Sequence, residues 1–227
     1  MLQRAVQGVV VLALLMAVVT GPAGASVNLA IIGSAQISGD ATNTPHNLIY
    51  DSSQSLLWLD YSYVADWSNA MSWAETLILT NVNTPAYIVN FSSGWRLPTV
   101  DNPTAWNLTA DSEMGRLYYT NLGLTQNNGV TDVRSANQRP FVDIRRSFYW
   151  SSTVFTGSGA GTGNITCAFD TTNGFQGGSD SINTIYPALA VHSASLVAVP
   201  EPSTYALLCL SLGVVGFARK KMVRSNG

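Results

Sequence analysis

Short runs in which hydrophobic and polar residues alternate follow one another along most of this chain, and this pattern predicts a sheet of short strands. The segment NLIYDSSQSLLWLDYS, at 47–62, has two apolar runs around a polar turn and predicts a hairpin in which Leu48, Tyr50, Leu57 and Leu59 could line one face. SFYWSSTVF predicts a strand, because it is rich in aromatic and β-branched residues. ITCAFDTTNGFQ predicts a hairpin that turns at Asn173-Gly174, and PALAVHSAS predicts a closing strand.

Two stretches instead repeat their apolar residues at helical spacing. DWSNAMSWAETLILTN predicts a helix with Asp66 as its N-cap, because a carboxylate there accepts the free amide protons of the first turn. DSEMGRLYYTNLG predicts a second helix, which Asp111 or Ser112 caps and Gly123 ends. The apolar faces expected in the core are Trp67, Ala70, Met71, Ala74, Leu77 and Ile78 in the first helix, and Met114, Leu117, Tyr118 and Leu122 in the second.

Segments rich in Asn, Ser, Thr, Gly and Pro separate these elements and predict loops. They are SAQISGDATNTP, the irregular TNVNTPAYIVNFSS, the polar stretch 125–140 and TGSGAGTGN. VNLAII, at 27–32, is either a first strand or a loose lead-in. Two helices with about six to eight short, mostly antiparallel strands define an α+β domain.

The segment GWRLPT, at 94–99, joins bulky apolar residues to a charge. Pro98 restricts the preceding Leu97 to an extended conformation. Trp95 and Leu97 then point to one side, toward the core. Arg96 points to the other side, toward an acidic side chain or a set of backbone carbonyl groups.

The N-terminus has the pattern of a processing signal. Residues 1–4 are a short basic lead, 8–19 an apolar run, and Ala23-Gly24-Ala25 fits a small-residue cleavage pattern. We interpret residues 1–25 as a secretory signal peptide that is cut between Ala25 and Ser26. A membrane anchor is the alternative, but about 12 apolar residues fall short of the ~20 that span a bilayer.

The C-terminal segment, VPEPSTYALLCLSLGVVGFARKK, joins a Pro-Glu-Pro motif to a short apolar run and a basic cluster. As a helix the run at 205–218 would span about 21 Å, at ~1.5 Å per residue, against a hydrocarbon core of ~30 Å. This length suits a transient membrane anchor better than a permanent one. Arg219, Lys220 and Lys221 would hold the C-terminus in the cytoplasm.

Charge argues against two kinds of partner. Between residues 26 and 199 there are six arginines, no lysine and twelve acidic residues, which gives a net charge of −6. Binding to nucleic acid or to anionic lipid needs a basic face, so we expect neither as a partner.

No constellation of catalytic residues stands out. Cys167 is the only cysteine between residues 26 and 199, and its apolar alternating neighbours favour a buried strand residue over a catalytic thiol. No spacing singles out a pair of carboxylates for acid–base work, so we expect Asp51, Asp60, Asp66 and Asp170 to be solvated surface groups. The motifs of common hydrolases and phosphate-binding loops are also absent, and we expect neither an enzyme nor a cofactor.

A calcium-dependent sugar site would need a cluster of carboxylate and amide oxygens. The EPN and WND triplets of calcium-type lectins are absent from the sequence. Only Ser179–Ser181 and the surroundings of Asp132 offer such oxygens, so calcium is possible but is not supported by a motif.

Taken in order, NLIYDSSQSLLWLDYS, WSNAMSWAETL, GWRLPT, SEMGRLYYTNLG, YWSST and ALAVH resemble the Lcl C-terminal domain-like proteins, a family of bacterial exported domains. The resemblance covers roughly residues 47–193 and implies a C-type-lectin-like fold. Two features depart from the family: the segment before GWRLPT is longer, and His192 stands where an arginine is frequent. The motif residues, which are expected to have structural roles, are Trp58, Trp67, Trp95, Arg96, Leu97, Pro98, Tyr149, Trp150, Ser151 and Ser152.

The C-terminal segment resembles the PEP-CTERM sorting signal. The motif residues are Val199, Pro200, Glu201, Pro202, Ser203 and Thr204. The resemblance implies that an exosortase cuts at or near Pro-Glu-Pro, in a Gram-negative envelope system associated with exopolysaccharide production, whereas an uncut tail anchor is the alternative. Together with signal peptidase, this route would take the chain through the inner membrane to the cell surface or the extracellular matrix.

The expected organisation is a signal peptide at 1–25, a lead-in at 26–46, an Lcl C-terminal-like domain at 47–195 and a sorting signal at 196–227. Two functions remain open. The chain is either a surface protein that binds polysaccharide as an adhesin or lectin, or a structural component of a biofilm matrix without a specific ligand. For the first function Trp106, in PTAWNLT, is the candidate aromatic contact to a sugar ring, and a half-buried loop tryptophan is the alternative.

Overall fold

The computed structural model describes residues 28–91, 94–101, 111–130, 140–156, 164–179 and 182–200. These residues form a nine-stranded sheet with two short helical segments, so the predicted α+β class is confirmed in this coarse form. The strands are β1 (Leu29–Ile37), β2 (His46–Asp51), β3 (Leu56–Ala65), β4 (Leu79–Asn83), β5 (Tyr87–Phe91), β6 (Phe148–Thr156), β7 (Asn164–Asp170), β8 (Phe175–Ser179) and β9 (Tyr186–Ala198). The helices are α1 (Trp67–Glu75) and α2 (Glu113–Gly115), and α2 continues into the π-helix η1 (Arg116–Asn121). Within this described part, no helix is long and apolar enough to cross a membrane.

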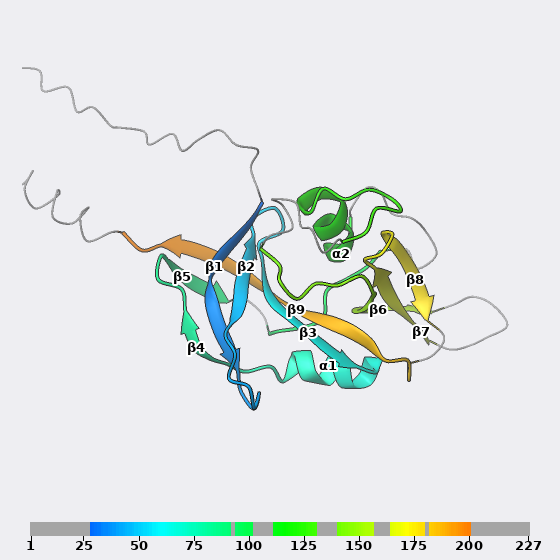
Figure 1. Ribbon diagram of the computed structural model, residues 1–227, viewed down its shortest axis with the longest axis horizontal. Coiled ribbons are helices and arrows are strands. Elements are labelled where there is room, and N and C mark those ends of the chain that lie inside the picture. Colours follow the sequence, from blue (N-terminus) through cyan, green and yellow to red (C-terminus); the bar gives the residue numbers. More distant parts are fainter. Residues whose placement is uncertain are drawn as a thin grey trace, which may run out of the picture.

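The sheet runs in the order β4-β1-β2-β3-β9-β6-β7-β8, and β5 pairs with β9 away from this path (Figure 1). Among the described strands the pairings are antiparallel, as predicted, except for one parallel contact between Trp150 of β6 and Ala188 of β9. The strands number nine rather than the predicted six to eight.

β9 is the strand around which the others are arranged. One of its edges pairs with β3. Its opposite edge meets β5, then Arg96, then β6. The backbone hydrogen bonds alternate accordingly, because Val191 exchanges two bonds with Arg96 whereas Ala194 donates to Ser55 beside β3.

The hairpin predicted at 47–62 is confirmed. Leu48 lies opposite Leu59, and Tyr50 lies opposite Leu57, in the β2–β3 pair. These four side chains join one hydrophobic cluster on one face of the sheet.

The first predicted helix is confirmed, but it is shorter than its apolar pattern indicated. Asp66 caps α1, and its carboxylate accepts the amide proton of Asn69 at 2.9 Å. The helix ends at Glu75, because the chain then turns into β4 and the carbonyl of Ile78 accepts the amide proton of Ser38 beside β1. Ile78 was assigned to the core-facing stripe and is 64% exposed, so that assignment was wrong.

The second predicted helix is confirmed at both ends. Its N-cap is Ser112 rather than Asp111, since the Ser112 hydroxyl accepts the amide proton of Gly115 at 3.0 Å. Gly123 follows the helix with a φ of 66°, a value that glycine adopts without strain. The predicted apolar face is buried, and it covers sheet residues that include Trp58 and Val191.

Two segments predicted to be loops are strands. Residues 34–37 belong to β1, and residues 79–91 supply β4 and β5. In β1 the buried Ala35 and Ile37 join a hydrophobic cluster. In β4 and β5 backbone pairing rather than burial defines the strand, as the polar pairs Ser34–Asn83 and Asn90–Ser195 show. The lead-in at 26–46 therefore contains β1, which lies between β2 and β4. Of the other predicted loops, 131–139 and 157–163 lie outside the described residues.

Candidate functional site

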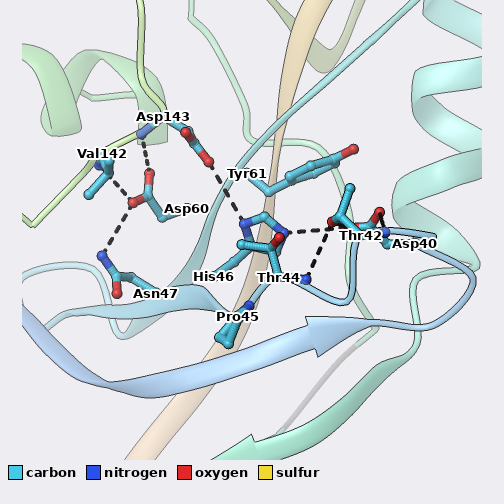
Figure 2. A pocket seen from close by; sticks show the side chains of 10 residues that line it. All are labelled: Asp40, Thr42, Thr44, Pro45, His46, Asn47, Asp60, Tyr61, Val142 and Asp143. Carbon is cyan, nitrogen blue, oxygen red and sulfur yellow. Dashed lines mark hydrogen bonds and ion pairs between the residues drawn. The ribbon is translucent and has the colours of Figure 1, made fainter.

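A pocket of about 400 Å³ lies where the β1–β2 connection, β3 and the segment before β6 meet (Figure 2). Its walls come from residues 40–47, 60–61 and 142–143, which are far apart in the sequence. The lining residues are Asp40, Thr42, Thr44, Pro45, His46, Asn47, Asp60, Tyr61, Val142 and Asp143.

His46 stands between two carboxylates in this pocket. Its Nε2 is 3.7 Å from Oδ2 of Asp40, and its Nδ1 is 3.8 Å from Oδ2 of Asp143. The side chain of His46 is only 9% exposed, and its Nε2 has no hydrogen-bond partner among the described residues. This nitrogen is buried and faces the Asp40 carboxylate, so His46 helps to hold the acidic side chains of the pocket in place.

Asp60 holds the walls of the pocket together. Its two carboxylate oxygens accept the backbone amide protons of Val142 at 2.7 Å and Asp143 at 3.0 Å. The side chain of Asn47 donates to it from β2 at 3.4 Å. These bonds fix the segment before β6 against β2 and β3, and they account for the burial of this carboxylate.

Asp40 is oriented by its own loop. Its carboxylate accepts the backbone amide proton of Thr42 at 2.9 Å and the hydroxyl proton of Thr42 at 2.8 Å, and these bonds lower the pKa of Asp40. Burial, with a smaller contribution from the charge of Asp40, raises the pKa of Tyr61. At neutral pH the pocket therefore holds an ionised Asp40 close to a protonated phenol.

Three aromatic rings form a strip that leads from the pocket along β3. We call Tyr61, Trp73 and Tyr63 the aromatic strip. The Tyr61 ring meets His46 edge-on with centroids 4.7 Å apart, and Trp73 of α1 lies 6.0 Å from Tyr61. Trp73 stacks on Tyr63 at 4.8 Å with an interplanar angle of 10°. All three rings of the strip are half-buried, so each keeps part of its surface in contact with solvent.

Sequence reasoning missed this site. It treated residues 40–45 as a plain loop and Asp60 as a surface acid, and it assigned no role to His46 or Tyr61. The signal that could have found the site is one of only two histidines, placed six residues after Asp40 and directly after Pro45.

Three of the four carboxylates predicted to be solvated are buried, so that prediction was wrong for Asp51, Asp60 and Asp170. Hydrogen bonds compensate their burial. Asp51 accepts the amide proton of Ser53 at 3.0 Å in the β2–β3 turn, and Asp170 accepts that of Thr172 at 2.8 Å in the β7–β8 turn. Asp66, the fourth, caps α1.

The structure brings the Lcl-like motifs together. The amide of Ser152 donates to the carbonyl of Pro98 at 2.9 Å, which joins YWSST to GWRLPT. The indole of Trp67 donates to the carbonyl of Ser151 at 2.9 Å, and the indole of Trp150 donates to a carbonyl at the end of β3 at 3.0 Å. Of the other motif residues Trp58, Leu97 and Tyr149 are fully buried, whereas Trp95 is half-buried.

Arg96 points toward an acidic side chain, which is one of the two outcomes the sequence allowed. Its guanidinium donates two hydrogen bonds to the carboxylate of Glu113, at 2.7 and 2.5 Å, and this pairing raises the pKa of Arg96. Glu113 also accepts the amide proton of Thr99 at 2.9 Å. The ion pair therefore ties α2 to GWRLPT and has a structural role.

Cys167 is a buried strand residue, as predicted. It lies in β7 with no exposed surface, and burial raises its pKa to about 11. The thiol therefore stays protonated at neutral pH.

In the part of the chain that the structure covers, no group of three or more His, Cys, Asp or Glu side chains could hold a metal ion. Of the residues with side-chain oxygens that the sequence offered for calcium, Ser179 is described, at the end of β8. Asp132, Asp180 and Ser181 lie outside the described residues.

Several predicted site residues also lie outside the described residues. They are Ala25, Ser26, Trp106, Glu201, Pro202, Ser203, Thr204, Arg219, Lys220 and Lys221. Val199 and Pro200 are described and follow β9 directly. The amide of Val199 donates to the carbonyl of Ala86 at 3.0 Å, so the fold reaches the first residue of the sorting motif.

Comparison with known proteins places this chain in the class of exported proteins that a C-terminal signal sorts to the cell surface. Residues 198–222 match the PEP-CTERM protein-sorting motif, the substrate signal of exosortases, as the sequence predicted. No curated protein and no solved structure matches the chain. The Lcl resemblance and the C-type-lectin-like fold therefore stay predictions.

Proposed function

We propose that this exosortase-sorted protein binds polysaccharide at the cell surface or in the extracellular matrix, through the pocket around His46 and the aromatic strip. The observation that carries the proposal is the juxtaposition of a pocket that holds His46 and two neighbouring carboxylates with three half-buried aromatic rings. Signal peptidase and exosortase are its processing enzymes in this proposal.

The chemistry of the site suits a sugar. The C–H face of a pyranose ring is apolar and stacks on an aromatic ring, while its hydroxyl groups donate to carboxylates and accept from polar hydrogens. The aromatic strip offers rings for stacking, and Asp40, His46 and Asp143 offer polar groups for the hydroxyls. Trp106 lies outside the described residues and stays a separate candidate contact.

The proposal is for binding without catalysis and without a cofactor. The buried carboxylates of the described residues already accept hydrogen bonds within the fold, and the one described thiol is protonated at neutral pH. Calcium is left to the experiment, because a polysaccharide can supply some of the oxygens that a calcium ion needs.

A binding titration tests the proposal. The mature chain, recovered from the surface of the producing cell, is titrated with that cell's exopolysaccharide and with a glycan panel, in calcium and in chelator. We expect saturable binding that survives the chelator. Removing the ring with Tyr61→Ala should weaken it by about tenfold, because one stacking contact contributes up to ~1.5 kcal/mol.

Two further variants locate the site. Asp143→Asn removes a carboxylate that faces His46 and should weaken binding, whereas Glu75→Gln removes an exposed charge outside the pocket and should not. Saturable binding that neither Tyr61→Ala nor Asp143→Asn weakens would refute this site. No binding to any glycan would refute the function and would favour a structural matrix component.

A further inference from the structure

β5 and the last part of β9 form a two-stranded ribbon at one end of the sheet (Figure 1). Ile88 pairs with Val197, so the two side chains lie on the same face, and Val199 lies two residues further along that face. Ala86, whose carbonyl bonds to the amide of Val199, adds to it. We call these four residues the apolar ribbon face. Ile88 is 56% exposed, Val197 50% and Val199 42%.

The apolar ribbon face lies on the same side of β9 as residues that are buried further along the strand. Because side chains alternate along a strand, Val197 and Val199 lie on the same side of β9 as Leu189 and Val191. Leu189 and Val191 are buried in the cluster that α2 and η1 cover. Ser193 and Ser195, the latter paired with Asn90, lie between these two apolar pairs on the same side of β9. The apolar pair nearest the C-terminus is the one that the described residues leave exposed.

The two chain segments that supply the apolar ribbon face carry no formal charge. No Asp, Glu, Lys or Arg occurs at residues 76–95 or at residues 182–200. Moving these two segments out of water therefore desolvates no ionised group of their own, and desolvating such a group is the largest cost of contact with an apolar medium. The nearest acidic residue along the chain is Glu201, two residues after Val199.

The predicted membrane segment lies close to this face along the chain. Tyr205, where the apolar run of the sorting signal begins, is six positions after Val199, and six extended residues reach at most about 21 Å. A chain held in a bilayer by residues 205–218 therefore keeps the end of the ribbon within that distance of the lipid.

We propose that the apolar ribbon face lies against the lipid surface while the sorting segment anchors the chain, and that it holds the Pro-Glu-Pro motif at the membrane interface. The contact depends on apolar side chains, so it does not require anionic lipid. This proposal rests on the sorting signal and is independent of polysaccharide binding.

The test uses the full-length chain reconstituted in phosphatidylcholine vesicles. Cys209→Ser leaves Cys167 as the remaining cysteine, and burial together with its raised pKa protects that thiol from labelling. An environment-sensitive fluorophore is then attached to Ile88→Cys or, in a separate sample, to Val64→Cys. Val64 is a matched control, since it is 59% exposed and pairs with Pro187, ten residues before Val197 on β9.

We expect a blue shift and quenching by brominated lipid for the label at residue 88, and neither for the label at residue 64. Adding phosphatidylglycerol should change neither result. If Ile88→Cys does not fold, Val197→Cys probes the same face from the paired strand.

Two outcomes would overturn the proposal. The first is equal access of an aqueous quencher to the labels at residues 88 and 64. The second is a label at residue 88 that is shielded from the aqueous quencher but is not quenched by brominated lipid, because a protein neighbour, such as a second copy of the chain, would then cover the face.

Discussion

The two halves of β9 lie in different surroundings. Residues 188–192 have β3 on one edge and Arg96 and β6 on the other, and they are buried. Residues 195–198 pair with β5, and most of them are exposed. Both halves are mostly apolar and contain no Asp, Glu, Lys or Arg, so their different burial comes mainly from what packs on them.

The largest effect is expected in the covered half. Trp150 is fully buried, packs against Ala188 of β9 and donates a hydrogen bond through its indole. Trp150→Ala should lower the free energy of unfolding by about 3–5 kcal/mol, as loss of a large core side chain does. Urea unfolding measures this effect, and Trp150→Phe should retain part of the stability. A loss below about 1 kcal/mol would mean that this half is no better packed than the ribbon.

A smaller effect is expected where α2 is tied to the covered half. Glu113→Gln removes the charge that pairs with Arg96, and it leaves a half-buried guanidinium with weaker partners. We expect a loss of about 1–3 kcal/mol in the free energy of unfolding, the range for hydrogen bonds to charged groups. Glu75→Gln, on the exposed side of α1, is the control and should change little. Equal effects of the two substitutions would show that the ion pair contributes no more than a surface charge.

The smallest effect is expected on the ribbon. Val197→Ser replaces a half-exposed side chain, so the free energy of unfolding in solution should change by no more than about 0.5 kcal/mol. The same urea experiment measures it. A loss comparable to that of Trp150→Ala would show that the apolar ribbon face is packed in solution, and the contrast between the two halves would disappear.

The elements that the sequence predicted well depend on local chemistry. Asp66 and Ser112 cap helices by bonding amides three residues ahead, and Gly174 turns the β7–β8 hairpin with a φ of 85°. Such signals act within one turn of chain, so a short window of sequence contains them. Arg96 is an intermediate case. The extended segment before Pro98 predicted the side to which Arg96 points, but its partner Glu113 lies 17 residues away.

The parts that the sequence did not predict depend on distant contacts. The pocket exists because Asp60 binds the amides of residues 142 and 143, 82 and 83 positions away. Asp51 is buried partly because it accepts a hydrogen bond from Asn121, 70 positions away. β4 and β5 have few buried side chains and are strands because β1 and β9 pair with them. No local periodicity carries this information.

The burial of Cys167 has a consequence for the redox behaviour of the protein. The thiolate is the form that reacts with disulfides and oxidants, and exported proteins meet oxidising surroundings. A thiol with no exposed surface and a pKa near 11 neither forms mixed disulfides nor joins two copies of the chain. The described fold is stabilised by its core and its hydrogen bonds. Its stability should therefore be the same under reducing and oxidising conditions.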